Sequence, residues 1–511
     1  MTNGHKAILF FYGGVGSVTG ANFLLAGERT KLLIDCGLIQ GEKFAHTLNR
    51  EPFPYSPASI GFLLVTHAHI DHIGRIPKLA RDGFAGQIIS TPETLELSRL
   101  MLPDAFSVLR SELREGEEPL YDEKDIEHAF SLWGTRPYHE SFQAGEFGVL
   151  FKDSGHILGS AMIEISLNKG STAVFGRRVV SPLLKGALPS SAGGMSTTPA
   201  SADGGTPFIK GDKRTIVFTG DLGNFPTPLL NKAEEITDTT YLVMESVYGD
   251  RNHEGGERRK ERLAEVIRAS VARGGTLLIP CFSLEKTQVL LSEMDELFSA
   301  EGGSASGGEA KLFGNIPVFL DSPLAIKVTE VYRRYARALN PEARKRMERG
   351  DDIFSFKNLR LTMDARASSE ITHAQSPKII IAGSGMSAGG RILEHERRYL
   401  GDPQNTILFI GYQAIGGLGR QIQEGVKNIR INHEDITVRA RIETITGYSS
   451  HMDSEHLQEF AAKAAEGGAL EKVFVVMGEP RSTLFLAQRI KDYHGIETYV
   501  PQLGESVEIE V

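Results

Sequence analysis

Short apolar runs that end in a sharp turn recur along this 511-residue chain and constrain its fold more than any other feature. Two examples are Leu32-Leu33-Ile34-Asp35-Cys36-Gly37 and Ile216-Val217-Phe218-Thr219-Gly220-Asp221. Stretches with helical spacing of apolar residues, such as 258–272 and 283–298, lie between such runs. This alternation predicts an α/β protein. Because single cores stop growing near ~250–300 residues, we expect two domains, and one can interrupt the other.

The composition excludes several classes of protein. A chain with 41% hydrophobic and 24% charged residues is neither wholly disordered nor collagen-like. The two cysteines, Cys36 and Cys281, exclude a disulfide framework and fit a reducing compartment, so we expect a cytoplasmic protein. No uncharged apolar run reaches the ~18–20 residues of a membrane span, and we therefore predict no membrane partner. The net charge of −9 argues against non-specific coating of nucleic acid.

Two stretches rich in glycine, serine and other small residues interrupt the pattern, at 181–207 and 301–309. Such a composition buries too little apolar surface to order itself. We predict flexible surface insertions, and a partner-binding loop is the alternative for the first stretch.

The densest group of chemically active side chains is the segment Thr66-His67-Ala68-His69-Ile70-Asp71-His72-Ile73-Gly74, directly after the apolar run 61–65. Three histidines and an aspartate so close together would repel and desolvate one another without a cation. Nitrogen and oxygen ligands without thiolate are typical of a catalytic zinc site. The spacing lets His67 and His69 bind one ion, while Asp71 and His72 face a second.

Two later strand ends supply further candidate ligands. His156 lies in Asp153-Ser154-Gly155-His156, and Asp221 ends the run that begins at Ile216. Alone, each is explained as well by a loop or turn residue. Together with the first segment they favour a metal centre in which Asp221 bridges both ions.

These residues resemble the metallo-β-lactamase fold hydrolases, which carry a His-x-His-x-Asp-His segment, a later histidine and a later aspartate in the same order. Asp35 matches the family's first motif, an aspartate that orients a ligand histidine. The segment Met244-Glu245-Ser246-Val247-Tyr248-Gly249-Asp250-Arg251 resembles the opening motif of the β-CASP nucleases, in which a second α/β domain is inserted into the metal-binding one. Further segments follow that family's order, so the resemblance covers nearly the whole chain apart from the two insertions: 280–288, 321–327, 383–391, 411–414 with 419–420, and 446–453.

The resemblance implies an αββα sandwich formed by residues 1–245 and 411–511, with a β-CASP domain at 246–410. It also implies a zinc-dependent ribonuclease that hydrolyses single-stranded RNA as an endonuclease, with exonuclease activity left open. Asp71 would help to position the attacking water. Glu245 and His451 would form the pair that delivers a proton to the leaving oxygen.

The segment 383–391 combines glycine N–H groups, small hydroxyls and an arginine after an apolar run. This combination predicts a cradle for phosphate, with a plain glycine-rich turn as the alternative. The candidate phosphate-binding residues are Ser384, Gly385, Ser387, Gly389, Gly390 and Arg391.

One position departs from the RNA-processing members of the family. Where they carry a second-site histidine, this chain has Met477, whose soft thioether is a poor ligand for zinc. We therefore expect one firmly bound Zn²⁺ and a weaker second ion held by Asp71, His72, Asp221 and water, unless His433 substitutes.

Several alternatives stay open at this point. The position of Met477 is also apolar in the DNA-acting Artemis-like branch, so a DNA nuclease is the first alternative. An RNA-binding scaffold with weakened catalysis is the second. A hydrolase of small thioesters or lactams would leave the inserted domain unexplained. A homodimer is not excluded by the sequence.

Overall fold

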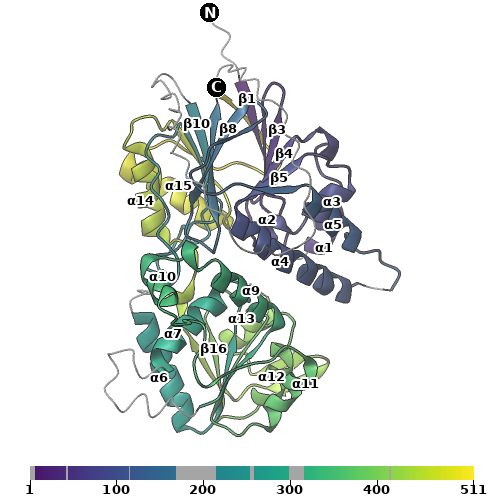
Figure 1. The fold of residues 1–511 in the computed structure, drawn as a ribbon, viewed down its shortest axis with the longest axis vertical. Coiled ribbons are helices and arrows are strands. Elements are labelled where there is room, and N and C mark those ends of the chain that lie inside the picture. The colour runs from purple at the N-terminus through teal and green to yellow at the C-terminus, as the bar shows by residue number, and fades with distance from the viewer. Residues whose placement is uncertain are drawn as a thin grey trace, which may run out of the picture.

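The computed structural model describes residues 6–41, 44–113, 115–167, 214–253, 258–298, 316–413 and 416–510. The predicted insertions at 181–207 and 301–309 lie outside these ranges. The described strands form two seven-stranded sheets, a six-stranded sheet and a two-stranded hairpin. Figure 1 shows the two larger sheets together at one end of the molecule and the six-stranded sheet at the other.

The first sheet has the strand order β22-β1-β2-β3-β4-β5-β6. Strand β1 pairs with β22 in antiparallel fashion, so the two ends of the described chain lie side by side. From β3 to β6 the strands run parallel. The strands are β1 (Lys6–Gly13), β2 (Asn22–Ala26), β3 (Lys31–Ile34), β4 (Phe62–Leu64), β5 (Gln87–Ser90), β6 (Trp133–Thr135) and β22 (Ser506–Glu510).

The second sheet has the order β21-β20-β11-β10-β9-β8-β7 and packs face to face on the first. The rings of Phe11 and Phe474 lie 5.5 Å apart across the two sheets, and those of Phe23 and Phe218 lie 6.2 Å apart. The strands are β7 (Phe142–Ala144), β8 (Phe147–Asp153), β9 (Ala161–Leu167), β10 (Arg214–Phe218), β11 (Tyr241–Met244), β20 (Lys472–Val475) and β21 (Thr498–Tyr499).

Helices cover the outer faces of both sheets and complete four layers (Figure 1). Those beside the first sheet are α1 (Ala45–Arg50), α2 (Ile70–Ile73), α3 (Ile76–Arg81), α4 (Pro92–Ser111) and α5 (Glu123–Ser131), with the short helix η1 (Pro57–Ser59). Those beside the second are α14 (Ser454–Ala465) and α15 (Pro480–His494). We call these four layers the sandwich. Among the described helices, none is both long enough and apolar enough to cross a membrane.

The third sheet has the order β14-β13-β15-β12-β16-β19, and all its strands run parallel. Its strands are β12 (Thr276–Pro280), β13 (Val318–Asp321), β14 (Leu359–Leu361), β15 (Lys378–Ala382), β16 (Thr406–Phe409) and β19 (Arg441–Thr444), and the hairpin is β17 (Asn428–Ile431) with β18 (Glu434–Thr437). The helices are α6 (Arg259–Ala272), α7 (Lys286–Phe298), α9 (Pro323–Arg334), α10 (Pro341–Glu348), α11 (Ala365–Glu370), α12 (Ile392–Tyr399) and α13 (Leu418–Gln423), with η3 (Ala336–Ala338) and η4 (Ile371–His373); the short helix η5 (Thr446–Tyr448) follows β19. We call this part the inserted unit.

The predicted α/β class, with a sandwich interrupted by a second α/β unit, is confirmed. The chain leaves the second sheet after β11 and returns to it at β20, which pairs with β11. Strand β19 belongs to the third sheet although it follows residue 410. We therefore propose that the inserted unit extends to about residue 445, beyond the boundary expected from the sequence.

A buried ion pair fixes helix α6 of the inserted unit near the returning chain. Arg259 lies 2.7 Å from the Glu293 carboxylate on α7, and both side chains are less than a tenth exposed. Arg259 also donates to the backbone oxygen of Gly447 at 3.0 Å, and its guanidinium lies over the Tyr448 ring. The Tyr448 hydroxyl donates to Glu293. Because both groups are removed from water, each charge is stabilised mainly by the other one.

We expect Arg259→Ala to lower the free energy of unfolding by about 3–5 kcal/mol, because it leaves Glu293 buried without its cation. Urea denaturation followed by circular dichroism measures this. Arg262→Ala on the same helix is the matched control, since its pair with Glu265 is half exposed, and it should cost only about 0–1 kcal/mol. An equal decrease in the free energy of unfolding for the two variants would contradict the proposed contribution of the buried pair to stability.

Candidate metal centre

The predicted metal ligands come from separate strands but meet at one edge of the sandwich. His67 and His69 follow β4, His156 follows β8, and Asp221 follows β10. Asp71 and His72 lie on the short helix α2, which begins directly after His69. The strand ends therefore carry the functional side chains, and the packed sheets behind them hold the strand ends in place.

Close backbone packing forces small residues next to the site. The backbone N–H of Cys36 donates to the His72 oxygen at 2.8 Å, and that of Ala21 donates to the Asp71 oxygen at 2.9 Å. A Cβ on Gly37 would lie 1.5 Å from the same Asp71 oxygen. A side chain at position 37 would therefore displace the segment that carries the ligands. This explains the glycine after the β3 strand.

One group of donor atoms comprises His67, His69, His156 and Asp221, whose ligand atoms all lie within 4.8 Å of one another. The Nδ1 atom of His69 is 3.1 Å from His67 Nε2 and 3.2 Å from His156 Nε2. The Asp221 Oδ2 atom is 3.4 Å from both of those Nε2 atoms. Burial, followed by the neighbouring imidazoles, holds the pKa of His69 well below its ordinary value. Neutral imidazoles and a carboxylate are the form in which these groups bind a metal.

The second group shares Asp221 through its other oxygen. His72 Nε2 lies 3.4 Å from Asp221 Oδ1 and 3.9 Å from Asp71 Oδ2. On its other side, His72 Nδ1 lies 2.7 Å from Asp35, whose carboxylate also accepts the backbone N–H and the hydroxyl of Thr66. Asp35 thus fixes the ring so that Nε2 faces Asp221, the arrangement expected for an aspartate that orients a ligand histidine.

The residues present fit metal ions at both groups. Among the described residues, His72 Nε2 and Asp221 Oδ1 are buried and have no hydrogen-bond partner. Buried polar atoms without partners are costly, and here two of them face each other. A cation between them would satisfy both. The donor set of imidazole and carboxylate suits zinc.

The predicted acid–base pair lies beside the first group. His451 Nδ1 is 3.4 Å from Glu245 Oε1 and 3.9 Å from Asp221 Oδ2. The Glu245 carboxylate accepts the backbone N–H of Leu222 at 2.6 Å, which fixes it behind the imidazole. Burial alone would lower the pKa of His451, but the carboxylates of Glu245 and Asp221 raise it above its ordinary value. His451 is thus suited to carry a proton, with Nε2 left for a substrate.

Met477 and His433 are the two residues that the sequence analysis connects with the missing ligand of the second ion. The Met477 backbone has a φ of 49°, and its side chain is buried in the core between the two sheets. A Cβ on Gly14 would lie 2.3 Å from the Met477 sulfur, so the thioether packs against that glycine. His433 is exposed in the turn between β17 and β18, outside both donor groups. It does not replace the missing histidine.

The structure gives the candidate phosphate-binding segment internal partners. The Arg391 guanidinium lies 2.6 Å from Asp321 and donates to the backbone oxygens of Thr362 and Met363. The Ser387 hydroxyl donates to Glu396, and Ser384 Oγ accepts the N–H of Ala388. Of the glycines in this segment, Gly385 packs against the Phe282 ring, Gly390 against the backbone of Gly383, and Gly389 has open space around it. Phosphate binding by this segment stays a prediction.

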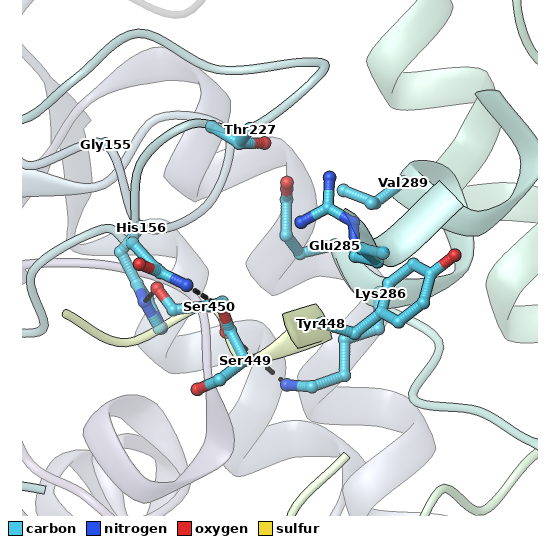
Figure 2. Close-up of a pocket in the computed structure, with 11 residues that line it drawn as sticks. Gly155, His156, Thr227, Glu285, Lys286, Val289, Tyr448, Ser449 and Ser450 are labelled. Atoms are coloured by element: carbon cyan, nitrogen blue, oxygen red, sulfur yellow. Dashed lines mark hydrogen bonds between the residues drawn. The ribbon is translucent and has the colours of Figure 1, made fainter. Parts of the chain in front are cut away.

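Three contributors to the site have no role in the sequence analysis. The Ser450 backbone oxygen lies 3.0 Å from His156 Nδ1, and His253 Nε2 lies 2.9 Å from the His451 oxygen. Lys286 of the inserted unit reaches Ser450 from the opposite side, as Figure 2 shows. Only the position of Ser450 next to His451 was visible as a signal in the sequence. The other two depend on long-range folding.

Comparison with known proteins agrees with this geometry. Residues 16–142 match the metallo-beta-lactamase superfamily, 287–422 the Beta-Casp domain, and 435–501 the Zn-dependent metallo-hydrolase RNA specificity domain. The chain is 30% identical over 504 residues to "Ribonuclease TTHA0252" of Thermus thermophilus, covering 98% of this chain and 99% of the relative. It is 29% identical to "Transcription termination factor FttA" of Pyrococcus horikoshii and 26% to that of Methanosarcina mazei. These matches cover 88% and 95% of this chain but only 61% and 69% of the two relatives.

The four-layer sandwich and its edge of histidines and aspartates define a metallo-hydrolase of the metallo-β-lactamase type. The inserted parallel sheet distinguishes this chain from metallo-hydrolases that consist of the sandwich alone. The chain belongs to the β-CASP family of the metallo-β-lactamase superfamily.

We expect Asp35→Ala to weaken metal binding by about 10–100-fold, because His72 loses the partner that orients its ring. Titration of the metal-free protein with zinc against a chelating indicator measures this. Glu508→Ala removes an exposed carboxylate far from the strand ends and should bind zinc like the wild type. Unchanged zinc affinity in Asp35→Ala would show that the ring is oriented by other contacts.

Proposed function

We propose that the protein is a zinc-dependent ribonuclease that hydrolyses phosphodiester bonds of single-stranded RNA, as an endonuclease. The observation that carries this proposal is the group of donor atoms from His67, His69, His156 and Asp221. Asp221 also faces His72 on one side and lies close to Glu245 and His451 on the other. The match of residues 435–501 to a domain described as an RNA specificity domain supports RNA over DNA. A full-length relative named as a ribonuclease supports the same substrate.

The residues divide the reaction between them. Divalent ions bound here would lower the pKa of a water molecule and neutralise charge on the attacked phosphate. His67, His69, His156 and Asp221 would hold one ion, and Asp71, His72 and Asp221 a weaker second ion. The Asp71 carboxylate accepts a hydrogen bond from the attacking water and orients it. His451 protonates the leaving oxygen through Nε2, while Glu245 holds Nδ1 on the opposite side of the ring.

The cellular compartment of the protein is proposed from its cysteines. Cys36 and Cys281 are buried free cysteines, which fits the reducing cytoplasm. Exonuclease activity and a homodimer stay hypotheses.

We expect His67→Ala to lower the rate of RNA cleavage by about 10²–10³-fold or more, because one metal ligand is lost at the reacting centre. The assay uses end-labelled single-stranded RNA and DNA of equal length, with and without a chelator. Chelation should abolish cleavage by the wild type. His494→Ala, at the exposed end of α15, is the matched control and should cleave normally.

The outcomes of this assay are distinct. Full cleavage by His67→Ala, with host nucleases excluded, would refute metal-dependent catalysis. A clear preference for the DNA strand would refute the substrate class alone.

We expect purified wild-type protein to retain one zinc ion per chain firmly and to lose the second on dialysis, because Met477 offers no imidazole. Met477→His should increase retention of the second ion, and elemental analysis after dialysis measures both. His433→Ala should leave the zinc content unchanged, since His433 lies outside the donor groups. Two tightly held zinc ions in the wild type would show that Met477 does not weaken the second site.

A further inference from the structure

Lys286 belongs to the inserted unit, yet its ammonium lies beside the metal centre of the sandwich. It is the first residue of α7, and its Nζ atom lies 3.4 Å from the Ser450 hydroxyl and 4.8 Å from the centre of the Phe282 ring. The backbone oxygen of the same Ser450 accepts from the candidate ligand His156. Figure 2 shows Lys286 directed across the interface toward Ser450, with His156 beyond it.

Electrostatic interactions place the Lys286 charge within reach of both donor groups. Burial lowers the pKa of Lys286, and this is partly offset first by Cys281 and Glu285 and then by the carboxylates of Asp221 and Asp71, which favour the charged form. In return, burial and the neighbouring imidazoles lower the pKa of His69, and the Lys286 ammonium lowers it further. The ammonium is therefore close enough to the donor groups to interact electrostatically with their carboxylates and imidazoles.

The charge of Lys286 has no ion-pair partner within 4.0 Å in the described ranges of the chain. The carboxylate of the adjacent Glu285 favours the charged form of Lys286 but forms no ion pair with it at this distance, and it accepts a hydrogen bond from the Tyr332 hydroxyl. A lysine ammonium carries three donors, and Ser450 takes one of them over a long distance. Donors therefore remain for an anion, and a partly buried cation favours one.

Two other cations of the inserted unit are already neutralised. Arg391 is paired with Asp321, and Arg259 with Glu293. Both pairs are 2.7 Å or shorter, and breaking either would remove the arginine that balances the charge of a buried carboxylate. Of these three basic side chains, Lys286 is the one that can take a phosphate without losing an existing ion pair.

We propose that Lys286 is a substrate-binding residue that contacts a non-bridging oxygen of the RNA phosphate lying at the metal centre. The inference deepens the proposed function and rests on it for the identity of the anion. It assigns the inserted unit a direct part in the site: the sandwich supplies the metal ligands and the proton, and the inserted unit supplies a positive charge from the opposite side.

A purely structural role is the competing explanation. In that case the contact between Lys286 and Ser450 holds the inserted unit against the sandwich. Both residues line a cavity of about 20 Å³, which has room for about one water molecule. The two roles differ in what they predict. A structural contact would depend on the Ser450 hydroxyl, whereas a phosphate contact depends on the charge at position 286.

The experiment measures binding and cleavage separately. Binding of a zinc-loaded protein to a 12-nucleotide single-stranded RNA with phosphorothioate linkages, which resists cleavage, is followed by fluorescence anisotropy over a range of salt concentrations. Cleavage of the ordinary RNA gives kcat and KM. The variants are Lys286→Met, Lys286→Arg, Ser450→Ala and, as a matched control, Lys260→Met, whose charge is about half exposed on α6.

For Lys286→Met we expect kcat/KM to fall by about 10–100-fold, the range for loss of a hydrogen bond to a charged group. The slope of log Kd against log salt should decrease by about 0.7, as for one lost phosphate contact on a single strand. Zinc content and the unfolding midpoint should not change. Lys286→Arg should keep the slope. Ser450→Ala removes only the hydroxyl and leaves the backbone oxygen that contacts His156, so it should also keep the slope. Lys260→Met should behave like the wild type.

Three results would overturn the inference: an unchanged slope in Lys286→Met, an equal loss in Ser450→Ala, or loss of zinc from Lys286→Met. Failure of the proposed function looks different. A wild type that binds the phosphorothioate RNA with a slope that depends on Lys286, but cleaves no RNA, would retain the phosphate contact and refute the ribonuclease.

Discussion

The structure depends on one electrostatic constraint, which is that histidines and carboxylates of several strands are buried together at a single edge. Asp221 lies 3.4 Å from His67, His72 and His156, and all of these side chains are nearly inaccessible to solvent. Burying that many polar groups without partners would be strongly unfavourable. A cation removes the difficulty, so the fold and its metal are expected to stabilise each other.

The inserted unit contributes a second edge, which carries a positive charge close to the buried histidines and carboxylates. In open α/β sheets, ligands bind at the loops that follow the carboxyl ends of the strands. The parallel sheet of the inserted unit has such an edge. The segments that begin at Cys281, Ser322 and Gly383 all start at this edge, and the hydroxyls of Ser283 and Ser322 lie 3.2 Å apart there. Lys286 follows the first of these segments. The candidate site therefore combines the edge of the sandwich that carries the donor groups with an edge of the inserted unit that carries Lys286 and serine hydroxyls.

The candidate metal ligands could be picked out of the sequence because their signal is local and chemical. His67, His69, Asp71 and His72 stand within six positions, and no ordinary turn accounts for that composition. The strand ends before His156 and Asp221 were also recognisable, since apolar runs followed by glycine predict strands and turns. The α/β class and the interrupted sandwich followed from the same pattern and from the family resemblance.

Partners distant in sequence were not predictable in the same way. Arg391 was a candidate phosphate ligand by residue type, but Asp321, 70 residues earlier, takes its charge. Lys286 lies in the segment 280–288, but its proximity to Ser450 could not be predicted, since it depends on how the inserted unit packs on the sandwich. The end of the inserted unit was placed at 410 for a similar reason: the pairing of β19 with β16 is decided by sheet packing rather than by local pattern.

The second donor group lacks the imidazole that the RNA-processing members of the family carry where this chain has Met477. Asp71, His72 and Asp221 remain, and two of their atoms are buried without partners in the described structure. With three protein ligands and a thioether that packs on Gly14, an ion there would keep more open coordination positions than one that also bound an imidazole. Such positions can be filled by water or by phosphate oxygens. Binding of this ion would then depend on the substrate, and a lysine that holds the same phosphate would strengthen that dependence. The substitution at 477 and the unpaired charge at 286 are thus consistent with a centre that becomes complete only when RNA is bound.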